Sequence, residues 1–255
     1  MAELTQPTAS PDPKTNRLLA KCEPGDYDAL MRHAKIVSLK FRNRLLHQDE
    51  RVDAVYFPLT CMISLLVTSE DKPRMEMATI GSEGVIGASE VLYTQGAIGL
   101  NLVQIPGEAL RIDANIFRKL VSTMPLVQQL IQRDQYVLTR QILFGAACNR
   151  FHSMNQRCAR WLLMTHDRAG KDTFPLTQEF LAHMLGVRRA TVNEATSMLK
   201  KAGLIRYVRG KITVLDRPGL EAVTCYCYQS IIKVYESQAP RTPKRPRSFS
   251  DAPKK

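Results

Sequence analysis

The most informative residues of the chain are four polar side chains near residue 190 whose chemistry suits contact with DNA bases. In chain order they are Arg188, Arg189, Asn193 and Glu194. The fork of an arginine matches O6 and N7 of guanine, asparagine pairs with adenine, and a carboxylate accepts a hydrogen bond from N4 of cytosine. We expect Arg189 and Glu194 to contact bases. The alternative for Glu194 is an intramolecular pair with Arg188 or Arg189.

The residues around them predict two short helices joined by a tight turn, over residues 178–197. Gly186 stands where the chain must reverse, and glycine tolerates the positive φ that such a turn often needs. Apolar and small side chains recur at spacings of three and four, which places them on one face of each helix. They are Leu181, Ala182, Leu185, Val192, Ala195 and Leu199. The pattern is typical of a helix-turn-helix whose second helix enters a major groove; the alternative is an ordinary helical hairpin in a core.

A small β-wing is predicted directly after the second helix. Two short strands, residues 204–207 and 211–215, flank a turn at Arg209-Gly210. The wing is basic, and we expect it to contact mostly phosphates, together with Thr177 and Thr191. The full set predicted to contact DNA is Thr177, Gln178, Arg188, Arg189, Thr191, Asn193, Glu194, Ser197, Arg206, Arg209 and Lys211.

The N-terminal half predicts an all-β domain. Short apolar runs, several of them alternating with polar residues, are separated by turn signals between Lys35 and Asp113. Many short strands at such spacing are typical of a sandwich or a barrel. A short helical segment, Asn16 to His33, comes before them. The strands are expected near residues 36–41, 55–58, 62–68, 75–80, 100–105 and 110–112.

A long helical segment is predicted from Asn115 to about Arg150, with a boundary at Met124-Pro125 because proline favours a first turn. A narrow apolar stripe extends over several turns of it, and such a helix usually pairs with a partner helix. We therefore expect a homodimer interface here; the alternative is that the stripe packs only on the chain's own β domain. The predicted interface residues are Val127, Leu130, Ile131, Val137, Leu138, Gln141 and Ile142.

Composition and charge bound the class of protein. The 255 residues are enough for two domains, and 44% of them are apolar, which is enough for a core. The net charge of +12 favours a polyanionic partner such as DNA. No apolar run approaches the length of a membrane span and no apolar signal core is present, so we expect a cytoplasmic protein without membrane contact. The sequence contains no Gly-rich phosphate loop, no zinc-ligand spacing and no nucleophile elbow, which argues against an enzyme.

The six cysteines do not form a recognisable framework. They are scattered along the chain, and only Cys225 and Cys227 are close in sequence. A Cys-x-Cys pair without a second pair or nearby histidines is a weak metal signal. Side chains two residues apart on one helix also do not face each other. We therefore predict no metal site; metal binding or redox sensing through this pair is the alternative.

The order of these elements, a β domain, a long helix and a winged helix-turn-helix, resembles the Crp/Fnr family of bacterial transcription regulators. The likeness covers about residues 20–235 and is most specific over 176–205 and the wing. Val55 to Pro58 and Ile80 to Gly87 are similar to landmarks of the family's cyclic-nucleotide-binding-type jelly roll. The resemblance implies an α+β fold, a homodimer paired along the long helix, a two-fold symmetric DNA site and contact with RNA polymerase. It also implies an effector that acts through the β domain.

The effector positions depart from the family pattern. Members that bind cyclic AMP follow the glycine matched here by Gly87 with a glutamate, where this chain has Ala88. Gly99 and Leu100 stand where the phosphate-binding arginine and its small neighbour are expected, and residues 75–110 contain no arginine or lysine. A buried phosphate without a cationic partner is costly. We predict that cyclic AMP is not the effector, and Gly87, Ala88, Gly99 and Leu100 remain the candidate effector pocket.

Comparison with the cofactor-binding members of the family also leads us to expect no cofactor. Iron–sulfur members carry a cluster of N-terminal cysteines, which Cys22 alone does not supply. A haem site would depend on a single histidine such as His33 or His47, and a lone histidine is more often structural.

The leading interpretation is a DNA-binding transcription regulator, and the alternative is a small-ligand sensor whose DNA contact is vestigial. Helices are also expected over Ser153–Asp167 and from Pro218 to about Ser237, with a loop over Arg168–Pro175. The polar terminal segments are expected to be disordered. The predicted divisions are a disordered N-terminus (1–16), a β-roll sensor domain (17–123), a dimerisation helix (124–150), a winged helix-turn-helix domain (151–237) and a basic disordered tail (238–255).

Overall fold

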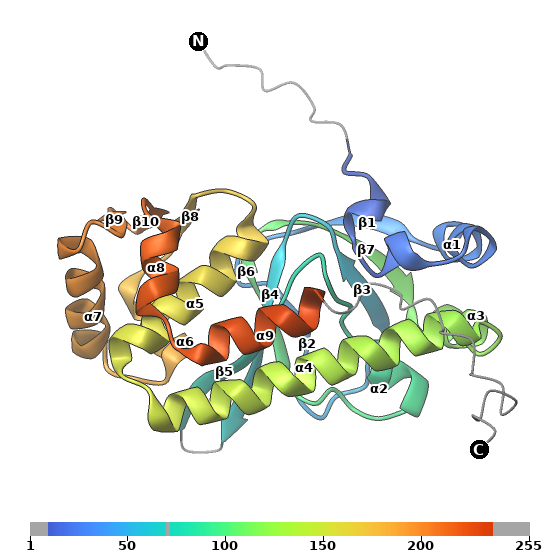
Figure 1. Cartoon of the computed structure of the whole chain (residues 1–255). Coiled ribbons are helices and arrows are strands. Elements are labelled where there is room, and N and C mark those ends of the chain that lie inside the picture. The colour runs from blue at the N-terminus through green and yellow to red at the C-terminus, as the bar shows by residue number, and fades with distance from the viewer. Residues whose placement is uncertain (1–9, 70–71, 237–255) are drawn as a thin grey trace, which may run out of the picture.

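The short apolar runs of the N-terminal half form a roll of two antiparallel sheets (Figure 1). The computed structural model describes residues 10–69 and 72–236. The strands of the roll are β1 (Lys35–Leu39), β2 (Arg44–Leu46), β3 (Ala54–Pro58), β4 (Met62–Ser69), β5 (Lys72–Ile80), β6 (Leu100–Ile105) and β7 (Gly107–Asp113). One sheet has the order β1-β7-β3 and the other β2-β6-β4-β5. The predicted all-β domain is therefore present.

Alternating side chains of the two sheets fill the core of the roll. Val55 lies opposite Ile112, and Phe57 opposite Leu110, across the β3–β7 pair. All four are buried, because side chains two residues apart on a strand share one face. Two elements were not predicted: β2, which has only three residues, and the short helix α2 (Ala88–Tyr93). Contacts with β3, α3 and α4 hold α2, and a sequence pattern does not reveal such contacts.

The segment before the roll is tied to it by a buried asparagine. The side-chain amide of Asn16 donates hydrogen bonds to the carbonyls of Pro58, at 3.0 Å, and Gly84, at 2.9 Å. The predicted disorder of residues 1–16 is therefore wrong from residue 10 onward; the residues before it lie outside the described part. The helical elements here are η1 (Pro13–Thr15), η2 (Leu19–Lys21) and α1 (Pro24–Met31).

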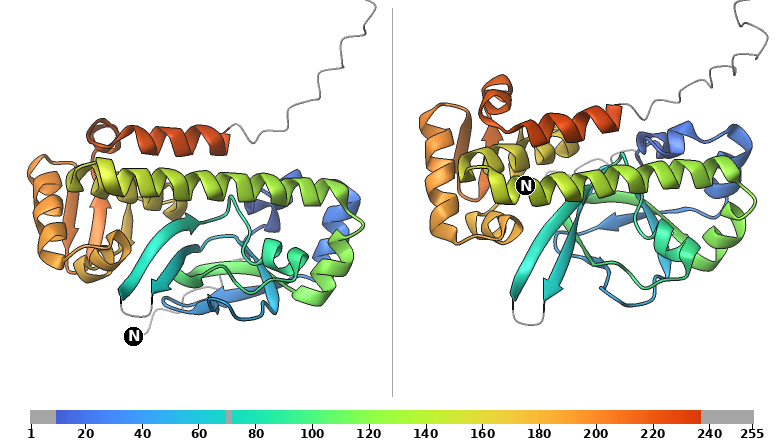
Figure 2. Two further views of the ribbon diagram at one scale, coloured as in Figure 1. Left: turned by 90° about the horizontal axis from the view of Figure 1, so that it is seen from below. Right: turned by 60° about the horizontal axis from the view of Figure 1, so that its bottom comes forward.

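Helix α4 (Pro125–Phe151) is the longest element and runs along the whole roll (Figure 2). It follows α3 (Ala114–Val121), and proline at its first turn explains the start, as predicted. The final helix, α9 (Tyr226–Glu236), lies beside α4 in both views of Figure 2. No helix within the described ranges is both long enough and apolar enough to cross a membrane.

The apolar stripe of α4 is buried inside the protomer, which corrects the predicted dimer interface. Four of the predicted interface residues are at most 2% exposed: Val127, Ile131, Val137 and Gln141. The core of the roll takes up the first two of these side chains, and α9 packs along the second half of the helix. Leu130, Leu138 and Ile142 are partly buried. The stripe is apolar because two elements of the same chain cover it, so it does not by itself indicate a partner.

The predicted last helix is in fact two helices. Its first part, α8 (Arg217–Val223), ends at Thr224, which has an extended backbone with ψ of 168°. Cys225 follows in the break, and α9 begins at Tyr226. The expected continuation to Ser237 and the expected tail over 238–255 lie outside the described residues. The break matters because it turns α9 back along α4.

Before α8, the C-terminal part contains three helices and a small sheet. The elements are α5 (Met154–Ala169), β8 (Thr173–Pro175), α6 (Gln178–Leu185), α7 (Arg189–Lys201), β9 (Ile205–Val208) and β10 (Lys211–Val214). The segment Arg168–Pro175, predicted as a loop, contains β8, which pairs with β10 and places buried Phe174 opposite Ile212. A three-residue strand leaves too little periodicity to detect in sequence.

A buried ion pair joins the roll to the C-terminal part. Arg168 Nε of α5 lies 2.7 Å from Glu83 Oε1, and the two side chains are only 4% and 12% exposed. Burial alone would lower the pKa of Arg168, but Glu83 and other nearby groups raise it, so the guanidinium stays charged. Close by, Trp161 Nε1 donates to Glu76 Oε1 at 2.7 Å. The docking of the two parts thus depends on polar pairs that are largely shielded from water.

We predict that Glu83→Ala destabilises the protein strongly, because it leaves the Arg168 guanidinium buried without a carboxylate. The expected loss is about 3–5 kcal/mol in the free energy of unfolding, measured by urea denaturation followed by circular dichroism. Asp53→Ala is the matched control, since its pair with Arg51 has side chains 77% and 80% exposed and should contribute less than about 1 kcal/mol. Equal midpoints for wild type and Glu83→Ala would show that the ion pair does not support docking.

Candidate nucleic-acid interface

The two helices predicted around Gly186 are present, with the turn chemistry that the sequence indicates. Thr177 caps α6 by accepting a hydrogen bond from the Phe180 backbone N–H at 3.1 Å. Gly186 ends α6 with φ of 64°, a left-handed conformation that favours glycine. The backbone N–H of Gly186 donates a hydrogen bond to the carbonyl of His183, which closes the last turn of α6. The chain is thereby reversed for α7.

Helix α7 has one buried and one exposed face. Val192, Ala195 and Leu199 are at most 3% exposed and pack on the C-terminal core. The opposite face is open to solvent, and α7 forms one edge of the whole molecule (Figure 1). The exposed residues among those predicted to contact DNA are Thr177, Arg188, Arg189, Asn193, Glu194, Ser197, Arg206, Arg209 and Lys211, while Gln178 and Thr191 are partly buried. Nine of the eleven residues are therefore exposed and two are partly buried, on or at the ends of α6, α7 and the wing strands.

Two of the polar residues are already engaged with each other. The side-chain amide of Gln178 donates to Asn193 Oδ1 at 2.8 Å, which links the start of α6 to the exposed face of α7. By contrast, the ion pairs found in the described part of the chain do not include Glu194. The alternative in which Glu194 pairs with Arg188 or Arg189 is thus not realised in this conformation. Its carboxylate faces solvent.

The wing lies beside the start of α7. Its strands β9 and β10 pair in register from Ile205 opposite Val214 to Val208 opposite Lys211. The Tyr207 hydroxyl donates to the Leu176 carbonyl at 2.9 Å and fastens the wing to the strand before α6. Burial raises the pKa of Tyr207, and the nearby charge of Arg189 opposes that shift. The arginines of the helix and the basic wing therefore form one positive surface.

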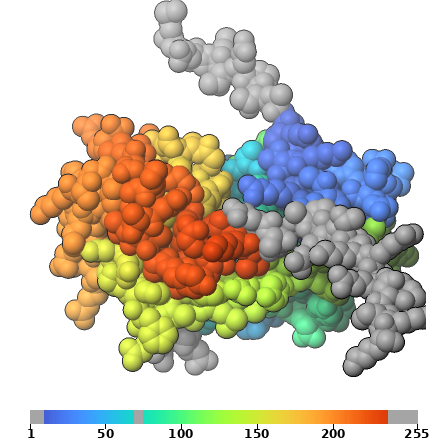
Figure 3. Space-filling model, in the orientation of Figure 1, coloured from blue at the N-terminus to red at the C-terminus, as the bar shows by residue number. Residues whose placement is uncertain are grey.

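This positive surface is accessible. In the space-filling view, the orange residues of the C-terminal part form the rounded end of the molecule away from the roll (Figure 3). Exposed cationic side chains on a protruding helix and an adjacent hairpin suit contact with both a groove and its flanking phosphates. The arrangement is that of a winged helix-turn-helix.

The candidate effector positions lie in packed structure. Ala88 is 1% exposed and Leu100 is 5% exposed, while Gly87 caps α2. A side-chain Cβ at Gly99 would meet the Leu66 carbonyl oxygen at 2.6 Å, so the backbone leaves no space there for a larger residue. These positions therefore supply neither a charge nor a hydrogen-bonding side chain.

A pocket beside α2 was not predicted from the sequence. It has a volume of about 530 Å³ and lies between α2, α3 and α4. Its lining includes Leu92, Arg118, Gln128 and Ile131. The Arg118 Nε donates to the Val91 carbonyl at 2.8 Å, which fixes the guanidinium at the cavity wall. These residues come from three separate elements, so no local pattern would have found them.

Comparison with known proteins agrees with this arrangement. Residues 156–223 match the family model of the Crp-like helix-turn-helix domain. The chain is 26% identical over 223 residues to the cAMP-activated global transcriptional regulator CRP of Pasteurella multocida, covering 82% of this chain and 98% of that protein.

Two solved structures show that the likeness in fold extends over both halves. FixK2 from Bradyrhizobium japonicum has a TM-score of 0.65 at 17% identity and is matched over 75% of this chain and 98% of its own. A transcriptional regulator of the Crp/Fnr family from Eubacterium rectale has a TM-score of 0.63 at 15% identity, with 82% and 98% covered. Residues 156–223 therefore resemble a Crp-like helix-turn-helix domain, and the chain as a whole shares the fold of these two proteins.

Proposed function

We propose that the protein binds specific double-stranded DNA sites as a homodimer and regulates transcription at promoters. The observation that carries the proposal is the exposed face of α7, where Arg188, Arg189, Asn193 and Glu194 point to solvent beside a basic wing. The positive charges on this face repel one another unless an anion binds there. DNA supplies both anionic phosphates and base edges that these side chains can contact. In this proposal RNA polymerase is a further partner and the cytoplasm is the site of action.

Within this interface we assign base contacts to the helix and phosphate contacts to the wing. Arg189 lies in the first turn of α7, the end that enters the groove in this motif. Glu194 lies one turn further on, and a carboxylate facing DNA is favourable where a cytosine N4 donates to it. Lys211 lies on β10, in the wing that flanks the helix, where it meets a backbone rather than a base edge.

Arg189→Ala and Lys211→Ala should weaken DNA binding in different ways. Arg189→Ala should cost about 1–3 kcal/mol on the specific site and relax discrimination at one base pair per half-site. Lys211→Ala should weaken specific and random DNA alike and lower the slope of log affinity against log salt by about one. Binding is measured by fluorescence anisotropy on sites first selected from genomic fragments.

Lys233→Ala, an exposed lysine on α9, is the control for loss of positive charge outside the interface and should leave both affinities unchanged. Equal losses on specific and random DNA for Arg189→Ala would move the base contacts to Arg188 and Asn193. Failure of the wild type to shift any genomic fragment would instead favour the alternative of a ligand sensor with vestigial DNA binding.

The proposed dimer uses a different face of α4 from the buried stripe. Tyr136 and Leu143 are large apolar residues on α4 that remain 58% and 63% exposed. Thr139 and Ala146 are also exposed, and their spacing of three and four from these residues makes one continuous face. An exposed face of this spacing on a long helix is suited to pairing with the same helix of a second copy.

Leu143→Arg should convert the dimer to a monomer, because the new arginine of each copy would be placed in the helix pair without an anionic partner. Sedimentation velocity at one protein concentration measures the change. Leu215→Arg, which alters a 54% exposed leucine away from α4, should remain dimeric. Leu138 is unsuitable for this test, since it packs against the core of the roll and its replacement would disturb the protomer itself. Identical sedimentation of wild type and Leu143→Arg would exclude this face.

We expect no binding of cyclic AMP to the roll at micromolar concentration. The buried apolar Ala88 and Leu100, together with the crowded backbone at Gly99, provide no partner for a ribose hydroxyl or a phosphate. Isothermal titration calorimetry tests this, with a cyclic-AMP-binding regulator of the family as the positive control. A micromolar isotherm with one site per chain would contradict the prediction and reopen the assignment of the effector positions.

A further inference from the structure

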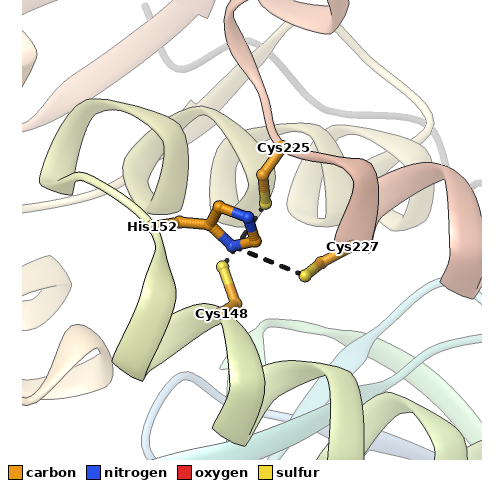
Figure 4. A group of neighbouring side chains, drawn as sticks. All are labelled: Cys148, His152, Cys225 and Cys227. Atoms are coloured by element: carbon orange, nitrogen blue, oxygen red, sulfur yellow. Dashed lines mark hydrogen bonds between the residues drawn. The ribbon is translucent and has the colours of Figure 1, made fainter.

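Four metal-ligating side chains converge outside the DNA interface, at the end of α4 nearest the C-terminal part. They are Cys148, His152, Cys225 and Cys227 (Figure 4). The potential ligand atoms, three Sγ atoms and one imidazole nitrogen, all lie within 4.8 Å of one another. None of the six cysteines forms a disulfide. The cluster is therefore a set of soft donors gathered in one place.

The break between α8 and α9 creates this arrangement. Cys148 is in the last turn of α4, and His152 caps that helix four residues later, so both point to the same side. Cys225 precedes α9 and Cys227 lies within its first turn. Because Cys225 is outside the helix, the rule that side chains two apart on a helix diverge does not apply. Both sulfurs of the Cys-x-Cys pair face α4, which the sequence pattern alone did not predict.

The separations match a single tetrahedral ion. Cys148 Sγ is 3.4 Å from Cys225 Sγ, and Cys227 Sγ is 3.6 Å from His152 Nδ1. Around Zn²⁺ with Zn–S of about 2.3 Å and Zn–N of about 2.0–2.1 Å, two sulfurs lie about 3.8 Å apart and a sulfur and a nitrogen about 3.5 Å apart. All four potential ligand atoms lie within 4.8 Å of one another, so the remaining separations are also close to those around one ion. A cluster of several irons would need its ligand sulfurs farther apart.

The surroundings also suit a metal with thiolate ligands. The three cysteines are 0–4% exposed, whereas His152 is partly exposed and offers a route of access. Three thiolates with one Zn²⁺ carry a net charge of −1, which a buried site tolerates only near a cation. Arg160 is 8% exposed, acts electrostatically on Cys148 and Cys227, and has a buried Nε without a hydrogen-bond partner in the described structure. Its charge opposes that of the cluster.

We propose that Cys148, His152, Cys225 and Cys227 form a structural Zn²⁺ site that clamps the start of α9 to the end of α4. Three thiolates and an imidazole in tetrahedral order favour zinc over harder cations, and four protein ligands leave no open position for catalysis. The site lies where α4 passes into α5 and the DNA-binding part begins, so the bound ion fixes that junction. This assignment replaces the prediction that the chain has no metal site, and it does not depend on the DNA-binding proposal.

The direct test is metal content and coordination in the full-length protein. Protein purified with a thiol reductant should contain one zinc per chain by plasma mass spectrometry. After exchange, Co²⁺ should give the intense visible absorption of tetrahedral coordination and a near-ultraviolet thiolate charge-transfer band with the strength of three Co–S bonds. Absence of zinc after incubation with excess Zn²⁺, or an octahedral Co²⁺ spectrum, would overturn the proposal.

Variants assign the ligands. Cys227→Ser and His152→Ala should each weaken zinc binding by on the order of 100-fold, measured by competition with a chromogenic chelator. Cys158→Ser, which alters an equally buried cysteine outside the cluster, is the matched control and should bind as wild type. Chelation should lower the Tm of wild type and of Cys158→Ser, because both lose a bound ion, but not the Tm of His152→Ala. Each protein is compared with itself with and without chelator, so a misfolded variant does not account for the difference.

Unchanged zinc affinity in both ligand variants would exclude the site. The 3.4 Å separation of Cys148 and Cys225 also allows a disulfide under oxidation. A different result would assign these cysteines as a redox pair in place of a metal site. In that case the reduced protein binds no zinc, and its mass falls by that of two hydrogen atoms on exposure to air.

Discussion

The arrangement of the whole molecule depends on one buried guanidinium. Arg168 of α5 pairs with Glu83 of the roll at 2.7 Å and donates to the hydroxyl of Tyr235 on α9 at 3.1 Å. The Tyr235 hydroxyl in turn lies 2.6 Å from the side-chain amide of Gln141 on α4. One charge therefore connects the roll, the long helix α4, the helix-turn-helix part and α9. Separating these elements would leave the buried charge without its partners, so the ion pair and its hydrogen bonds favour the observed arrangement.

The same network explains how α9 serves the fold. Tyr235 holds the C-terminal half of α9 against α4 and α5, and the proposed zinc site holds its first turn against the end of α4. Between the two, apolar contacts cover the face of α4 that would otherwise be free. Any rearrangement that moves α7 relative to the roll must alter the α4–α5 junction, which lies between these two attachments, or the contacts of α6 with β5.

The sequence predicted the helix-turn-helix well because its signals are local. The apolar spacing from Leu181 to Leu199 and the glycine at position 186 define both helices and their turn within about twenty residues. Strands of the roll were located for the same reason. Elements with weaker local signals were missed: β2 and β8 have three residues each, and α2 has six. The predicted single helix after Pro218 failed at Thr224 and Cys225, where no proline or glycine marks the break.

By itself the sequence determined the resemblance to the Crp/Fnr family, the order of the structural parts and the cationic residues of the helix-turn-helix, because each follows from neighbouring residues. Only the tertiary structure decided what covers a surface and which distant residues meet. An apolar stripe records burial but not the burying partner, so α4 appeared to be a dimer interface until α9 and the roll were seen to cover it. Likewise Cys148 and Cys225 are 77 positions apart in the chain, and only the turn of α9 along α4 brings their sulfurs within 3.4 Å.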